Sequence, residues 1–401
     1  MPPLTLAVVG NPGNRRTALF QDAVRAAGLP AAREVAWLDV LRGRAVFRAG
    51  ETVRIDSPGE DPEVDRLLRG TDDPTRVEGT GRWYERFMAA ARDVARTASA
   101  AGAELLAAPG ELAVLFDKRL CHGVLDEAGV PVPVSPTSGP AAPAVSGWDD
   151  IRSLMAGAGL HRAFVKLAHG SSASGVLAVE TAGPGRVRAT TSVERDSAGR
   201  LFNSLRVRRY TTEHEVAAIV DTLAPDGLHI EQWVPKAAQE GRSADLRVVV
   251  VAGRATHAVL RTSASPMTNL HLGGRRGDLD AARAAIEAAG GSWASALAVC
   301  EEAAACFPDT HCVGVDLLPA RGWRRFAVCE VNAFGDLLPG LTGLAGRGAE
   351  GLDTYAAQLA ALPARTGART RSGTAHRTAH RTAKERNDRE TTTSASETRL
   401  R

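Results

Sequence analysis

The first hundred residues alternate short apolar runs with stretches of helical periodicity. Leu4 to Val9 is an apolar run that predicts a strand, and the apolar spacing from Thr17 to Ala27 predicts the helix after it. The Gly- and Asp-rich segment from Gly59 to Gly81 is expected to form turns. The same patterns predict a strand, a long helix and another strand at Glu34 to Leu38, Trp83 to Ala100 and Leu105 to Ala107. This alternation is typical of an α/β unit.

From Phe116 onward, strand patterns dominate. A helix is expected from Phe116 to Ala128, and the Pro-, Ser- and Gly-rich segment from Thr137 to Ser146 is expected to be a loop. Strands are predicted at Ala163 to Leu167, Val176 to Val179, Arg186 to Ser192, Leu201 to Tyr210, Leu228 to Val234, Leu246 to Ala252, Ala255 to Arg261, Val313 to Leu318 and Arg324 to Val331. Helices are predicted at Glu213 to Leu223, Leu279 to Ala289, Trp293 to Cys306 and Asp353 to Ala361. Thr212 and Glu215 have the spacing of a capping box for the first of them.

These patterns predict a protein of the α/β (α+β) class with two folded domains and a tail. The first domain is expected to span residues 1–115, and the second residues 116–363. Residues 364–401 consist largely of Thr, Ala, His, Arg and Ser, which offer little apolar surface to bury. This basic tail is therefore expected to be disordered.

Composition and charge exclude several protein classes. The 401 residues are 44% hydrophobic and 24% charged, as in ordinary globular proteins. The net charge is +3, but the tail holds ten basic and four acidic residues, so that residues 1–363 carry −3. This gives no reason to expect nucleic-acid binding. No apolar run approaches the about 18 residues of a membrane span, and the N-terminus lacks the basic start of a signal peptide. A cytoplasmic protein without membrane contact is expected.

Polar residues stand in the last two predicted strands. Phe326, Val328, Glu330 and Asn332 are expected to share one face, because side chains alternate along a strand. Asp316 adds a second carboxylate to this face if the two strands pair. Oxygen ligands suit Mg²⁺ or Mn²⁺, and acids within apolar strands are costly to bury without a cation. The alternative is a carboxylate satisfied at a strand end.

A lysine and a loop of small residues occur together in the middle of the chain. Lys166 lies within an apolar strand, and the segment HGSSASG, His169 to Gly175, follows directly. An ammonium group and the exposed N–H groups of a Gly/Ser loop both attract phosphate oxygens. The alternative is a flexible linker, and Lys118 alone would be a solvated charge on a helix.

The order of these motifs resembles the ATP-grasp superfamily, particularly the branch of glutathione synthetase and the ligases that add glutamate to ribosomal protein tails. The resemblance spans about residues 116–341. It would make residues 1–115 the preceding α/β domain and residues 116–363 the ATP-grasp domain, with two subdomains that hold ATP between them. The similar segments are DKRLCHGVLDEAGVPVP, FVKLAHGSSASGV, HIEQWVP, DLRVVVVAGRATHAVLRT, TNLHLGG and GVDLL with CEVNAFGDLLPGL.

The resemblance implies roles for individual residues. Lys118 and Lys166 would bind phosphates beneath a mobile loop that includes Ser171 and Ser172. The hinge Glu231, Gln232, Trp233 and Val234 would hold adenine and ribose, and Asp245 and Asn269 would contact the nucleotide. Mg²⁺ would be held by Asp316, Glu330 and Asn332.

One position departs from the family pattern. Related ligases have an arginine two residues before the asparagine of the TNLHLGG segment, where this chain has Met267. Arg261, Arg275 or Arg276 could supply the charge that neutralises phosphate, since a guanidinium pairs bidentately with it. The alternative for each is an exposed surface arginine.

The resemblance implies an ATP-dependent ligase that joins a carboxylate to an amine through an acyl-phosphate. The catalytic residues would be Lys166, Arg261 and Arg275, and His169 and His271 are candidate bases. Its partners would be ATP, Mg²⁺ or Mn²⁺, and a small-molecule or peptide carboxylate and amine, and a homodimer is left open. The alternatives are an ATP-binding sensor or regulator of the same fold, favoured by Met267, and a small-molecule kinase.

Overall fold

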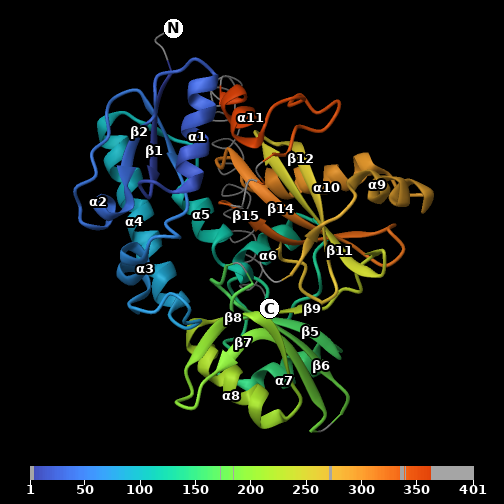
Figure 1. The fold of residues 1–401 in the computed structure, drawn as a ribbon. Coiled ribbons are helices and arrows are strands. Elements are labelled where there is room, and N and C mark those ends of the chain that lie inside the picture. The colour runs from blue at the N-terminus through green and yellow to red at the C-terminus, as the bar shows by residue number, and fades with distance from the viewer. Residues whose placement is uncertain are drawn as a thin grey trace, which may run out of the picture.

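Three β-sheets form the framework of the protein, and each is built mainly from strands that lie close together in the sequence (Figure 1). The computed structural model describes residues 4–171, 173–183, 185–270, 273–334, 338 and 340–362. The predicted mixture of α and β structure is confirmed. The tail, residues 364–401, lies outside the described residues.

The N-terminal sheet is parallel and carries helices on both faces. Alternate residues of its central strand point to opposite sides: Val9 packs in the cluster of Phe87, and Val8 in the cluster of Phe20. The strand order is β2-β1-β3-β4. These strands are β1 (Thr5–Gly10), β2 (Arg33–Ala36), β3 (Glu51–Ile55) and β4 (Glu104–Leu105). The helices are α1 (Arg15–Ala26), α2 (Trp37–Leu41), α3 (Pro62–Arg69), α4 (Thr80–Ala101) and α5 (Pro109–Leu115).

The expectation of turns throughout Gly59 to Gly81 is wrong for α3. Asp61 caps this helix by accepting from two backbone N–H groups, and Gly70 ends it with a left-handed φ of 79°. Val64 and Leu68 are buried against the sheet side. The helix has eight residues, which is too short for a clear apolar period.

The second sheet is antiparallel, with the strand order β8-β7-β6-β5-β9. Its strands are β5 (Arg162–Leu167), β6 (Leu177–Thr181), β7 (Val187–Arg195), β8 (Leu201–Tyr210) and β9 (Leu228–Gln232). It packs on α7 (Trp148–Gly157), α8 (Glu213–Leu223) and the 3₁₀ turn Ala224–Asp226 through one buried apolar cluster. The predicted capping box of Thr212 and Glu215 is confirmed at the start of α8.

The third sheet is also antiparallel, with the order β13-β12-β11-β14-β15, and β10 pairs with β11. Its strands are β10 (Ala238–Gln239), β11 (Arg242–Val251), β12 (Arg254–Ser263), β13 (Arg275–Arg276), β14 (Cys312–Pro319) and β15 (Phe326–Asn332). The accompanying helices are α6 (Lys118–Glu127), α9 (Leu279–Ala288), α10 (Trp293–Ala305) and α11 (Thr354–Ala360). β14 and β15 pair directly, as the candidate metal site requires.

Polar and aromatic contacts join the three units, each of which consists of one sheet and the helices that pack on it. Asp226 accepts hydrogen bonds from Gly79 N at 2.7 Å and Gly81 N at 2.9 Å, which ties the start of α4 to the second unit. Tyr355 of α11 packs near Phe20 of α1, with ring centroids 6.5 Å apart. Across the described ranges, no helix combines the length and apolar character needed to cross a membrane.

Candidate functional site

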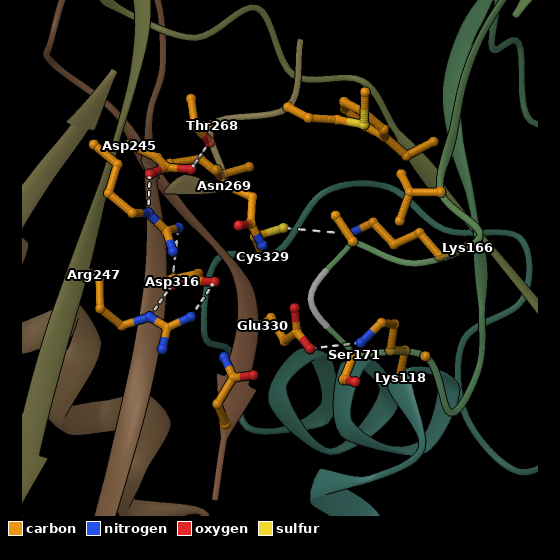
Figure 2. A pocket seen from close by; sticks show the side chains of 18 of the residues that line it. Lys118, Lys166, Ser171, Asp245, Arg247, Thr268, Asn269, Asp316, Cys329 and Glu330 are labelled. Atoms are coloured by element: carbon orange, nitrogen blue, oxygen red, sulfur yellow. Dashed lines mark hydrogen bonds and ion pairs between the residues drawn. The ribbon is translucent and has the colours of Figure 1, made fainter. Parts of the chain in front are cut away.

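A cleft of about 240 Å³ lies between the second and third sheets (Figure 2). β5 and β9 form one wall, and β11, β12, β14 and β15 form the other. Among the described lining residues, six are cationic and four are acidic, a surplus that suits a polyanion. The cations are Arg16, Lys118, Lys166, Lys236, Arg247 and Arg261, and the acids are Glu231, Asp245, Asp316 and Glu330.

Lys166 and Glu231 form a buried ion pair in the first wall. β5 and β9 pair so that Phe164 faces Glu231 and Lys166 faces His229, which places all four side chains on one face. Burial opposes the charge of Glu231, but Lys166 and His229 outweigh it and lower the pKa of Glu231 to about 2. Burial also opposes the charge of Lys166, but the surrounding sulfur and carboxyl groups outweigh it and raise the pKa. Both groups are therefore charged at neutral pH.

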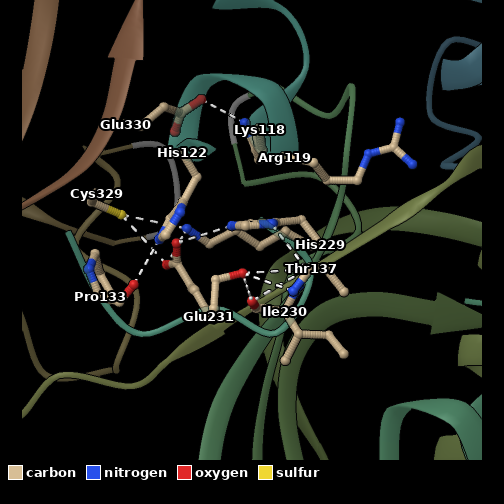
Figure 3. A network of polar contacts seen from close by, with 12 residues as sticks. Lys118, Arg119, His122, Pro133, Thr137, His229, Ile230, Glu231, Cys329 and Glu330 are labelled. Carbon is tan, nitrogen blue, oxygen red and sulfur yellow. Dashed lines mark hydrogen bonds and ion pairs between the residues drawn. The ribbon is translucent and has the colours of Figure 1, made fainter. Parts of the chain in front are cut away.

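A polar network behind the ion pair holds Glu231 in place (Figure 3). His229 Nε2 lies 3.7 Å from Glu231 Oε2, and His229 Nδ1 lies 3.1 Å from Thr137 Oγ1. The Thr137 hydroxyl also accepts from Ile230 N at 2.8 Å. Burial lowers the pKa of His229, so that its ring is neutral at pH 7. The carboxylate therefore has a fixed position at the wall.

Lys118 is positioned by the start of α6. Asp117 caps this helix by accepting from Arg119 N at 2.9 Å. Lys118 N donates to Ala168 O at 2.9 Å, which joins the helix start to the end of β5. The Lys118 ammonium then reaches across the cleft to Glu330 on β15, with a separation of 2.5 Å. Two segments that carry the predicted phosphate-binding lysines are thus bonded to each other.

Asp316 anchors the second wall. It is directly opposite Glu330 in the register of β14 and β15. Arg247 Nη2 donates to Asp316 Oδ2 at 3.0 Å, and Arg261 Nη2 lies 3.1 Å from Asp316 Oδ1. Burial opposes the charge on Asp316, but the two guanidinium groups outweigh it and lower the pKa to about 2.

A β-bulge at Cys329 changes the direction of the β15 side chains. Asp316 pairs with Glu330, but the next residue of β14 pairs with Val328, so that Cys329 is an extra residue. Val328 consequently points into the apolar core, whereas Cys329, Glu330 and Asn332 line the cleft. The expectation of one shared face is wrong for Phe326 and Val328, which both pack in the apolar core, since a bulge interrupts the alternation. The face was expected to hold Phe326, Val328, Glu330 and Asn332.

Asp245 organises the cleft rim on β11. Its Oδ1 accepts from Arg261 Nε at 2.7 Å, and its Oδ2 accepts from the hydroxyl of Thr268. Lys236 Nζ donates to Thr268 Oγ1 at 3.0 Å. Gly274 approaches this segment so closely that an added Cβ would lie 2.5 Å from Thr268 O. The second glycine of the TNLHLGG segment is therefore required, because a larger residue would collide with the backbone of Thr268.

Most predicted site residues come together in this cleft, although they span more than 200 positions of the sequence. Their individual roles stay predictions. The predicted residues that line the cleft are Lys118, Lys166, Ser171, Glu231, Gln232, Val234, Asp245, Arg261, Asn269, Asp316, Glu330 and Asn332.

Two predicted residues lie elsewhere. Trp233 packs its ring on Phe164 and under the Arg162 guanidinium, 3.9 Å from the ring centroid, and does not line the cleft. Arg275 is exposed on the edge strand β13, where it pairs with Thr262 in register. Arg275 is not among the described residues that line the cleft, and its catalytic role stays a prediction.

The two candidate bases and the loop serine Ser172 are not among the described residues that line the cleft. His169 stacks on Tyr84 with ring centroids 4.0 Å apart, and its Nδ1 lies 2.9 Å from Phe116 O. This buried ring does not line the cleft, so it is not placed as a base there. Ser172 and His271 lie outside the described residues.

The sequence reasoning missed the following charged and hydroxyl-bearing residues of the cleft: Arg16, Lys236, Arg247 and Thr268. The sequence could have indicated Arg247, because it lies two residues after Asp245 in an apolar strand and therefore shares a face with it. Thr268 stands beside Asn269 in the TNLHLGG segment. Arg16 had no such signal, since only the tertiary fold brings it near β15.

Met267 is buried across the mouth of the cleft. It is 5% exposed and packs on Val176, at the end of the Gly/Ser loop, together with Phe164 and Ala173. The position where related ligases carry arginine is therefore apolar. Arg261 lies close by in the opposite wall, already paired with carboxylates.

Replacing Met267 with arginine is expected to lower stability and not to raise turnover. A guanidinium would enter an apolar contact without a partner, which costs about 1–3 kcal/mol. Met267→Leu, which keeps volume and polarity, should cost less than about 1.5 kcal/mol. Thermal unfolding of the two variants tests this, and an unchanged melting temperature with faster turnover for Met267→Arg would contradict it.

Acid is expected to destabilise the cleft in a defined range of pH. The folded pKa values of Glu231 and Asp316 are both about 2, below the ordinary values of 4.5 and 3.8. Each depressed pKa adds stability that is present above the unfolded value and is lost as protons bind. Stability should therefore fall as pH drops from about 4.5 to about 2. Denaturant titrations over this range measure the fall, and Glu231→Gln should flatten it.

The residues of the second wall fit a magnesium ion by their chemistry. Asp316 and Glu330 offer carboxylate oxygens, and Asn332, which lines the cleft, donates to Gly314 O through Nδ2 at 3.3 Å and has its amide oxygen left as a ligand atom. Such an all-oxygen set suits Mg²⁺. Within the described ranges, no group of three or more His, Cys, Asp or Glu side chains could hold a metal, so the amide is needed.

Comparison with known proteins identifies the fold. The ATP-grasp ligase PsnB with its minimal precursor is 16% identical over 90% of this chain and 99% of that chain, with a TM-score of 0.52. The D-cycloserine synthetase DcsG is 17% identical over 89% and 98%, with a TM-score of 0.51. The chain has the ATP-grasp fold. No family model matches the sequence, and no curated protein matches it significantly.

The ATP-grasp fold accounts for the cleft between the two antiparallel sheets. A further structure of PsnB, with a TM-score of 0.50, holds Mg, ADP and a phosphomimetic variant of its minimal precursor. At 16 to 17% identity, this likeness concerns the arrangement of the elements. The roles of the cleft residues rest on their own geometry.

Proposed function

We propose that the protein is an ATP-dependent ligase that joins a carboxylate to an amine and releases ADP and phosphate. One observation carries this proposal: three lysines, three arginines and an all-oxygen metal set converge on one cleft. Phosphoryl transfer needs this combination, because it depends on positioning and on neutralising the charge of phosphate oxygens. The ATP-grasp fold supports it.

Different residues of the cleft would have different roles in this reaction. The hinge from Glu231 to Val234 would hold the adenosine end, and Lys166 and Lys118 would position phosphates from two sides. Arg247 and Arg261 would keep Asp316 ionised and oriented toward the metal. Mg²⁺ held by Asp316, Glu330 and Asn332 would neutralise the phosphate oxygens.

The reaction would proceed through an acyl-phosphate. The substrate carboxylate would attack the γ-phosphorus, ADP would leave, and the amine would displace phosphate with loss of a proton. No histidine of the described residues lines the cleft. We therefore expect amine deprotonation to rely on the released phosphate or on solvent.

The substrate class is a small-molecule or peptide carboxylate. PsnB is a ligase complexed with a precursor peptide, and DcsG is a synthetase of a small molecule, so the fold serves both kinds. A nucleotide sensor is the second candidate, because Met267 removes the arginine that related ligases carry.

The test measures ADP release from Mg·ATP with pools of carboxylates and amines. A ligase releases ADP only when both are present and yields a product lighter by one water than the sum of the two. A phosphorylated product would indicate a kinase. Nucleotide binding without turnover under any pool would indicate a sensor.

A further inference from the structure

We infer that Arg16 binds the reacting carboxylate of the substrate at the end of the cleft that meets the N-terminal sheet. The inference rests on the proposed ligase function. Among the described residues that line the cleft, Arg16 is the sole contribution from residues 4–115. It belongs to the first turn of α1, whereas every other lining residue follows position 117.

The backbone beneath Arg16 is held rigidly. Asn14 caps α1 by accepting from Arg16 N at 2.8 Å, and it donates to Glu60 at 2.9 Å. Asn11 is buried and donates to Pro58 O and Gly59 O, each at 2.9 Å. The hydrogen bonds that Asn11 and Asn14 donate therefore connect the loop after β1 to the loop after β3. A side chain leaving from this turn therefore has a defined origin.

The guanidinium reaches the end of the strand that carries the metal set. Arg16 Nη1 donates to Phe334 O at 3.0 Å, two residues after Asn332. The ring of Phe334 is fixed by Phe116 and Phe87, at centroid distances of 5.4 and 6.2 Å. Arg16 thus stands at the same end of β15 as the proposed magnesium ligands.

A second cavity continues from this point toward the N-terminal sheet. It has a volume of about 40 Å³ and shares Arg16 and Phe334 with the main cleft. Asp56, directly after β3, lines it together with Arg54. In a parallel sheet with the order β2-β1-β3, the connections diverge between β1 and β3, where ligands of such sheets bind. The second cavity has room for only a few water-sized groups, so a part of the substrate that enters it beyond Arg16 would be small.

A guanidinium at this junction suits a carboxylate. It binds both oxygens through parallel N–H groups and reduces their repulsion from the γ-phosphate. Met267 leaves the opposite rim apolar, and Arg275 is not among the described residues that line the cleft. Arg16 supplies the positive charge from the N-terminal unit instead. The attacking carboxylate oxygen then forms its bond to phosphorus as the bond to ADP breaks.

Kinetics with three variants test this assignment. Arg16→Gln should raise the KM for the carboxylate at least tenfold, and Arg16→Lys should raise it less, while the Kd of Mg·ADP stays within twofold. Arg15→Gln is the matched control, because Arg15 is the exposed neighbour outside the cleft lining. An unchanged KM, or an ADP affinity that falls by the same factor as the KM rises, would overturn the inference.

A labelling experiment separates this inference from the ligase function. Phenylglyoxal modifies Arg16 and Arg15 in the full chain with Mg·ADP bound, and mass spectrometry measures each rate. Acetate, succinate and glutamate serve as probes. Slower labelling of Arg16 alone supports carboxylate binding even if no pool supports turnover, in which case the ligase proposal fails by itself. Equal labelling with and without all three probes overturns the inference.

Discussion

Glu330→Gln is expected to abolish turnover and, at the same time, to tighten the binding of metal-free ADP. The Glu330 carboxylate is paired with the Lys118 ammonium, so that a proposed metal ligand contacts a proposed phosphate-binding group. The variant removes the charge that we propose to bind Mg²⁺, and it releases Lys118 from the ion pair. An ion pair of this exposure contributes up to about 1 kcal/mol, which corresponds to roughly two- to fivefold in affinity.

Titration of a fluorescent ADP analogue with EDTA and with Mg²⁺ measures both effects. Wild-type protein should bind the analogue more tightly with Mg²⁺, and Glu330→Gln should lose most of this difference. Glu301→Gln is the matched control, because Glu301 on α10 forms a similarly half-buried pair with Arg347, and neither residue lines the cleft. Equal metal dependence in wild-type and Glu330→Gln protein would show that Glu330 does not bind the metal.

Lys166→Met is expected to cost both stability and nucleotide affinity. The Lys166 and Glu231 side chains are 9% and 2% exposed, and removing one partner leaves the other charge buried. Breaking such a pair costs about 3–5 kcal/mol of unfolding free energy. Loss of a charged hydrogen bond to phosphate costs a further about 1.5–3 kcal/mol of binding, or 10- to 150-fold in Kd.

The double variant Lys166→Met with Glu231→Gln separates the two effects. It removes the orphaned charge, so most of the lost stability should return, while ATP affinity should stay weak. Urea unfolding and nucleotide titration of the three variants complete the cycle. Recovery of ATP affinity in the double variant would mean that Lys166 has a structural role only.

Charged residues within apolar strands were the sequence feature that best predicted the site. Lys166 and Asp316 each interrupt an apolar run, and a buried charge needs a partner, so both had to meet other charged groups. The structure places Glu231 against Lys166 and two arginines against Asp316. The metal prediction depended on a pairing of β14 with β15, and the structure has these two strands as antiparallel neighbours joined by a short connection.

Three features depend on tertiary packing and had no local signal. The bulge at Cys329 depends on how β15 fits β14, and alternation alone cannot reveal one inserted residue. The burial of Met267 depends on a contact with Val176, about ninety residues earlier. Arg16 reaches Phe334 over 318 positions. Short elements such as α3 also fall below the length at which a period is visible.

Oxygen-18 transfer tests the central claim most directly. The substrate carboxylate, once found from the pools, is labelled in both oxygens and incubated with Mg·ATP, the amine and wild-type protein. Attack of the carboxylate on the γ-phosphorus moves one labelled oxygen into the released phosphate, with ADP and the amide as the other products. The account predicts one oxygen-18 atom in each phosphate. Unlabelled phosphate, or label in AMP, would contradict it.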